Sequence, residues 1–181
     1  MSIDESIVIA ARVLGLAVFA VAVLGKLRHR DEFVGVVANY RMLPASLAGA
    51  AAWLVIALEA SVVLALATGF ALAIGALLAV GLLVGFAGAM VVNLLRGRTE
   101  IDCGCFQSSL RQPLSSALVV RNALLGAALV PLLGADAGAT PTPFALLNGV
   151  AAGLVAAILY YAFGELLALR RAGEALRRKP A

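Results

Sequence analysis

The two cysteines of this chain lie in one triplet, Cys103-Gly104-Cys105, and they are the residues best suited to chemistry. Two neighbouring thiols support thiol–disulfide exchange, because the second thiolate can resolve a mixed disulfide formed by the first. Gly104 permits the backbone dihedrals that so small a ring requires, and a strained disulfide is a stronger oxidant than a relaxed one. The triplet predicts a redox-active pair; two inert thiols or a structural bridge are the alternatives.

A metal site is a weaker interpretation of the same residues. Structural zinc normally takes four ligands, and His29 is the only histidine, so a metal would need ligands from another chain. We therefore expect no metal. The sequence has no phosphate-binding glycine loop, Walker motif or hydrolase triad, so hydrolytic chemistry is not indicated. Whether the chain is an enzyme stays open, with thiol–disulfide oxidoreductase as the candidate activity.

Three charged residues, Arg12, Glu59 and Arg121, lie inside apolar stretches. Charges in lipid are costly, so they tend to pair and to mark function. We predict that Glu59, near the middle of its stretch, pairs with Arg121 or Arg12, and that Arg121 could instead support a cysteine thiolate. The alternatives are an ion pair that only fixes helix register, an arginine that reaches the headgroups, or the polar path of a small transporter. Asn93 and Asn122 are expected to form hydrogen bonds between helices.

The elements that must position these residues are membrane helices. Hydrophobic residues make up 63% of the 181, mean hydropathy is +1.04, and only 13% are charged, against roughly 25% in a soluble domain. A helix needs about 20 apolar residues to cross a bilayer, and five segments qualify: 7–27, 45–68, 70–95, 114–133 and 143–169. The fold class is therefore an all-α polytopic membrane bundle of about five transmembrane helices. The count falls to four if the tight turn at Thr68-Gly69-Phe70 is misplaced.

The connection 28–44 predicts a short amphipathic helix at the membrane surface after the first span. Its apolar residues, Phe33, Val36, Val37 and Tyr40, recur at helical spacing among charged ones. Within the spans, two small-xxx-small patterns, 81–85 and 149–153, would let helices approach closely.

The basic residues predict the orientation. Twelve of the 14 fall on one side of a five-span bundle, in two connections and the tail: Lys26, Arg28, Arg30, Arg41, Arg96, Arg98, Arg111, Arg170, Arg171, Arg177, Arg178 and Lys179. The positive-inside rule then places the N-terminus outside, and the C-terminus and the cysteine connection in the cytoplasm. We expect one transmembrane domain over 1–170 in the plasma (inner) membrane, with a basic cytoplasmic tail over 171–181. Short basic clusters between spans contact lipid headgroups, so nucleic-acid binding is excluded.

Taken together, several short motifs resemble the MauE family of methylamine-utilisation membrane proteins, grouped with DoxX-like redox-associated membrane proteins. The resemblance covers about residues 5–165, and its most specific part is Cys103-Gly104-Cys105-Phe106 followed by Arg121-Asn122. The rest consists of Arg12, Gly25-Lys26-Leu27, Phe33, Tyr40-Arg41-Met42-Leu43-Pro44, Glu59 and Arg96-Gly97-Arg98. Family members often carry glycine after Cys-Phe, where this chain has Gln107.

The resemblance implies that Cys103 and Cys105 are a redox pair, with Arg12, Lys26, Glu59, Arg121 and Asn122 as supporting residues. It also implies a thioredoxin-like partner of the MauD kind and an exported client with disulfides, similar to the methylamine dehydrogenase β-subunit. A bound quinone would be compatible, although no quinone site is evident in the sequence. Non-catalytic assembly factor or scaffold, and small transporter, remain the alternatives.

One conflict remains within these predictions. A client outside the membrane needs thiols accessible from outside, whereas the charge pattern puts the cysteines in the cytoplasm. Either the span count is wrong by one, or the connection re-enters the bundle, or the protein relays electrons across the membrane.

Overall fold

Six α-helices and two short 3-10 turns make up the chain in the computed structural model, which describes residues 4–99, 101, 114–135 and 141–177, with side chains as far as residue 170. In chain order these elements are α1 (Glu5–Arg28), α2 (Arg30–Asn39), η1 (Ala45–Leu47), α3 (Ala48–Thr68), α4 (Leu72–Leu95), α5 (Ser116–Leu129), η2 (Val130–Gly134) and α6 (Pro143–Arg177). There is no strand within these described ranges, so the predicted all-α class is confirmed.

Five of the helical segments are long and apolar enough to cross a membrane, as the sequence predicts. They are Glu5–Arg28, Ala45–Thr68, Leu72–Leu95, Ser116–Gly134 and Pro143–Arg170. The tight turn between α3 and α4 is confirmed: Gly69 has φ 75° and its N–H bonds the Ala65 carbonyl, while Ala71 also takes a positive φ of 54°. Glycine fits this position because the left-handed conformation costs it no steric strain.

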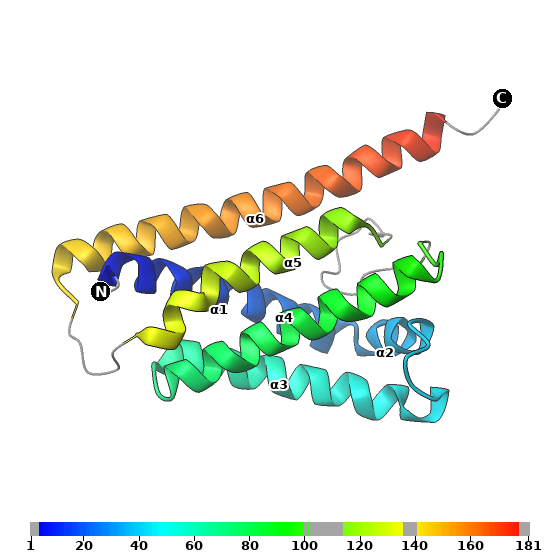
Figure 1. Cartoon of the computed structure of the whole chain (residues 1–181), viewed down its shortest axis with the longest axis horizontal. Helices are drawn as coiled ribbons and strands as arrows, with labels where there is room; N and C mark the ends of the chain where they lie inside the picture. The colour runs from blue at the N-terminus through cyan, green and yellow to red at the C-terminus, as the bar shows by residue number, and fades with distance from the viewer. Residues whose placement is uncertain (1–3, 100, 102–113, 136–140, 178–181) are drawn as a thin grey trace.

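The helices lie alongside one another, with α2 folded across one end of the bundle (Figure 1). We call this the α2 end; α4 finishes and α5 starts there, and α6 continues past it through the first residues of the basic tail. The first and last spans run in the same direction. The Thr142 N–H bonds Glu5 where both begin, and the Tyr161 hydroxyl donates to the Ala17 carbonyl at 3.0 Å further along.

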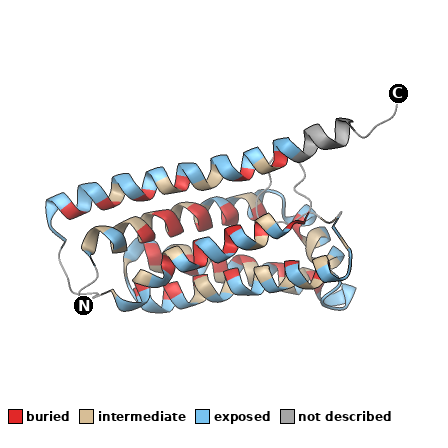
Figure 2. Cartoon of the chain, turned by 45° about the horizontal axis from the view of Figure 1, so that its top comes forward, coloured by how far each residue is buried: buried red, intermediate tan, exposed pale blue. Residues whose placement is uncertain are grey.

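The core is a column of apolar side chains between the helices, including Phe19, Val62, Leu66, Ala76 and Leu129. Large apolar residues also cover the outer surface, where soluble proteins carry charge; α6 alone exposes leucine, isoleucine and phenylalanine along most of its length (Figure 2). An apolar outer surface of this kind is what a bundle in lipid requires.

The two predicted small-xxx-small patterns differ in the contacts that their glycines make. A Cβ on Gly149 or Gly153 would lie 2.6 or 2.7 Å from the Cβ of Ile9 or Val13, so this pattern brings α6 close to α1. Among the described residues, a Cβ on Gly81 or Gly85 would meet no atom within 4 Å, so the 81–85 pattern brings no described helix of this chain close to α4.

The short helix predicted after the first span is also confirmed. Its one buried side chain, Phe33, packs against Ala52 and Ile56 of α3, and its charged residues face away from the bundle. The helix thus closes one end of the bundle, with a cavity between it and the neighbouring helices.

Candidate functional site

A buried ion pair joins α1 to α3 near the α2 end. Lys26, in the last turn of α1, donates to both carboxylate oxygens of Glu59, with Nζ–Oε1 and Nζ–Oε2 distances of 2.7 and 2.8 Å. The two residues are only 4% and 1% exposed. Two charges removed so fully from water depend on each other, because either one left buried alone would be strongly destabilising.

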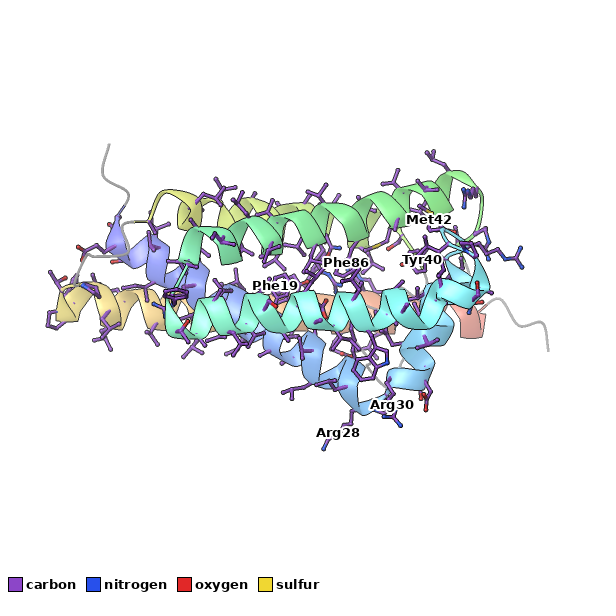
Figure 3. The ribbon with its side chains drawn as sticks, turned by 90° about the horizontal axis from the view of Figure 1, so that it is seen from below. Phe19, Arg28, Arg30, Tyr40, Met42 and Phe86 are labelled. Carbon is purple, nitrogen blue, oxygen red and sulfur yellow. The ribbon has the colours of Figure 1, made fainter. Side chains whose placement is uncertain are left out.

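This pair corrects two sequence predictions. Neither Arg121 nor Arg12 is the partner of Glu59, because both of its oxygens accept from Lys26. Lys26 also does not belong with the basic residues outside the bundle. Its side chain turns inward, whereas Arg28 and Arg30 extend away from the bundle (Figure 3).

A cavity of about 190 Å³ lies beside the ion pair, between α2 and the ends of α1, α3 and α4. Its walls are apolar except for Lys26 and the phenol of Tyr40. Figure 3 shows Phe86 between α4 and α3, with Tyr40 and Met42 beyond it toward the α2 end. The lining includes Lys26 of α1, Phe33 of α2, Tyr40 just after α2, Ala51 and Val55 of α3, and Phe86 of α4.

Two aromatic rings face the Lys26 ammonium across this space. Nζ lies 5.2 Å from the centroid of the Phe33 ring and 5.7 Å from that of Phe86. Both distances are within the range of cation–π attraction. The rings therefore offset part of the cost of burying the ammonium.

Arg12 lies at the opposite end of the bundle, and its role is local. Its guanidinium donates to the carbonyls of Leu66 and Ala67, the latter at 2.9 Å. These carbonyls belong to the last turn of α3, where the helix supplies no donor and the dipole favours a cation. Leu66 is seven residues beyond Glu59, roughly 10 Å along the helix, so Arg12 does not contact Glu59. The polar path through Arg12, Glu59 and Arg121 stays a prediction.

Arg121 and Asn122 lie side by side in α5, 3% and 2% exposed. The Arg121 guanidinium carbon is 5.1 Å from the ring centroid of Tyr160, so this arginine links α5 to α6. The Nδ2 atom of Asn122 is buried and has no hydrogen-bond partner within the described part of the chain. Asn93 does not bridge helices: it donates to Ala89 of its own helix and accepts from Arg98 just after it.

The described residues on either side of the cysteine connection are bonded to each other. Cys103 and Cys105 lie outside the described residues, so their pairing stays a prediction. The residues on either side of them are described: the Leu114 N–H donates to the Ile101 carbonyl at 3.0 Å. Both side chains join an apolar cluster with Met90, Leu118 and Phe86, and Phe86 also lines the cavity. The connection is therefore anchored next to the cavity.

This cavity could not be predicted from the sequence. Lys26 lies at the end of an apolar run, where lysines usually extend to the headgroups, so its inward turn could not be read from its position. The signal that could have identified the pair is that a charge buried in a membrane requires a partner of opposite charge. Glu59 lies in mid-span, and Lys26 is a cation in the last turn of α1, the helix packed against α3.

Comparison with known proteins identifies the family of this chain. The model of the family described as "Methylamine utilisation protein MauE" matches residues 4–134, a range that contains Lys26, Glu59, both cysteines and Arg121. No solved structure gives a significant match.

Three curated relatives carry the name "Methylamine utilization protein MauE". The protein of Paracoccus denitrificans is 38% identical over 159 residues, covering 87% of this chain and 86% of that protein. That of Paracoccus versutus is 46% identical, covering 83% and 81%, and that of Methylorubrum extorquens 44%, covering 80% and 79%. With the family model spanning most of the chain and the relatives covering most of their own lengths, this chain belongs to the MauE family of multi-pass membrane proteins.

Proposed function

We propose that this chain is a membrane component of methylamine utilisation that handles the disulfides of an exported protein. Cys103 and Cys105 are the exchanging thiols in this proposal. The names of the relatives supply the pathway, and the spacing of the only two cysteines supplies the chemistry. The family resemblance adds a thioredoxin-like partner and a client similar to the methylamine dehydrogenase β-subunit.

The observation that carries the proposal is the hydrogen bond between Leu114 and Ile101, which joins the two ends of the cysteine connection. Cys103 follows Ile101 by two residues and Cys105 by four. At about 3.5 Å per residue, the chain can carry them no further than about 7 and 14 Å from this anchor. The proposal therefore has the thioredoxin-like partner dock at the α2 end.

The distribution of arginines supports a cytoplasmic α2 end. Arg28, Arg30, Arg41 and Arg96 are all exposed there, whereas Arg12, at the other end, is bonded to helix carbonyls. Removing Lys26 from the basic residues predicted to lie on the cytoplasmic side leaves the charge asymmetry between the two sides almost unchanged. With the α2 end in the cytoplasm, the protein passes electrons across the membrane for its exported client, or the connection is accessible from outside.

The experiment replaces each cysteine in a methylamine-utilising bacterium that lacks its own MauE. We expect Cys103→Ser and Cys105→Ser to abolish growth on methylamine, while the control Ser109→Ala in the same connection supports growth like the parent. One of the two cysteine variants should accumulate a mixed disulfide with a thioredoxin-like protein that dithiothreitol releases. Normal growth of both variants would refute thiol chemistry and leave the scaffold alternative.

The orientation has its own measurement. A membrane-impermeant maleimide applied to intact cells should label the cysteines only after permeabilisation and reduction. Labelling of intact cells after mild reduction would instead put the pair outside and contradict the proposed orientation.

A further inference from the structure

The ammonium of Lys26 has one more hydrogen-bond donor than the protein uses. A lysine ammonium carries three N–H groups, and two of them donate to Glu59 at 2.7 and 2.8 Å. No other acceptor within the described ranges bonds Nζ. Because Lys26 is only 4% exposed, bulk water does not freely supply the missing acceptor. A buried donor without an acceptor is costly. The cavity of about 190 Å³ lies against this same side chain.

The side chains that line the cavity indicate which kind of ligand could supply the missing acceptor. Around Lys26 stand the Phe33 and Phe86 rings, and the remaining lining is almost wholly aliphatic. Glu59 already balances the lysine charge, so an anionic ligand would bring an uncompensated charge into an apolar space. The ligand that fits is neutral and apolar, with one acceptor oxygen at the tip that meets Lys26.

The size and the opening of the cavity narrow the choice further. An apolar cavity of about 150 Å³ is known to hold a benzene ring, so about 190 Å³ accommodates one substituted ring. Two lining residues, Met42 and Leu43, are 47% and 49% exposed, so the space reaches the surface between α2 and α3 at a mouth formed by these two apolar side chains, with the Arg96 guanidinium 4.0 Å from the Met42 sulfur beside it. Such a mouth suits a hydrocarbon tail that continues into lipid.

We propose that this cavity binds one molecule of a membrane quinone. The ring lies near Phe33 and Phe86, one carbonyl oxygen accepts the third N–H of Lys26, and the isoprenoid tail leaves past Met42 and Leu43. The inference concerns binding alone. It does not depend on the thiol chemistry proposed above, and its test uses protein without cysteines.

The test measures equilibrium binding of a radiolabelled short-chain ubiquinone to the purified Cys103→Ser/Cys105→Ser chain in lipid nanodiscs. We expect saturable binding of one quinone per chain. Ala51 lines the cavity and Ala57 faces outward from the same helix, so Ala51→Leu should weaken binding at least tenfold and Ala57→Leu should leave it unchanged. If Ala51→Leu does not fold, Ala89→Leu blocks the cavity from α4 instead.

Three results would overturn the inference. One is the absence of saturable binding to the cysteine-free parent. Another is equal affinity in the cavity-filling variant and Ala57→Leu. The third is a phospholipid photoprobe that labels the cavity and that excess ubiquinone does not displace, which would assign the space to an acyl chain. None of these results bears on whether Cys103 and Cys105 exchange disulfides, so the two proposals fail independently.

Discussion

Replacing Lys26 by methionine is the sharpest test of how the bundle is held together. The change keeps most of the side-chain volume but leaves Glu59, 1% exposed, without either of its two hydrogen bonds. Breaking a buried ion pair by removing one partner costs about 3–5 kcal/mol, because the other charge stays buried. For a chain of this size, each kcal/mol corresponds to roughly 2–4 °C, so Lys26→Met should lower Tm by about 6–20 °C.

The assay is thermal unfolding of the purified protein in nonionic detergent, followed by helical circular dichroism. Arg28→Met, at the same helix end but exposed, is the matched control and should change stability by no more than about 0.5 kcal/mol. The double variant Lys26→Met/Glu59→Gln removes both charges and should recover much of the loss, giving a coupling energy of about 2 kcal/mol. The reasoning would be refuted if Lys26→Met had the same Tm as Arg28→Met, or if the double variant were less stable than Lys26→Met.

Three further changes test the packing and the polar residues, each by the same melting assay. Gly153→Val should destabilise the protein by about 1–3 kcal/mol, because the added side chain would overpack against α1. Gly85→Ala, whose new Cβ would contact no described atom, should be neutral or stabilising by up to about 1 kcal/mol. Equal effects of the two changes would contradict the assigned α1–α6 contact. Arg12→Met should cost about 1–3 kcal/mol by leaving two carbonyls of α3 without their charged donor, and an unchanged Tm would show that those bonds are not formed. Asn122→Leu should be neutral or stabilising, because its Nδ2 is buried without a partner within the described chain; a marked loss of stability would mean that the amide makes a structural bond, while lost growth on methylamine at unchanged Tm would make Asn122 functional.

The span count could be predicted because membrane insertion constrains each helix separately. An apolar run must cover the bilayer thickness, so its length alone identifies it. Even the short turn at Gly69 was visible, since two runs of full length leave only a few residues between them. These are local properties, and one sequence carries them completely.

The contacts between helices were harder to predict, because they depend on which faces meet. The sequence required a partner for Glu59, and the prediction named the two arginines inside spans, Arg12 and Arg121, whereas the actual partner is Lys26 at the end of a helix. The patterns at 81–85 and 149–153 read alike, yet among the described residues only the second has a facing helix. The cavity was beyond prediction for the same reason, because four elements contribute to its wall.

The pairing of the first span with the last has a consequence for how the protein is made. Tyr161 reaches Ala17 across 144 residues, and Gly149 and Gly153 pack on residues 9 and 13. During synthesis, α1 enters the membrane first, and three further spans follow before its partner α6 emerges. Contacts so distant along the chain raise the contact order and make the docking of α6 a late step. Until then, the uncovered face of α1 can also pair with α6 of a second copy, so a domain-swapped dimer is a misassembly that this topology permits.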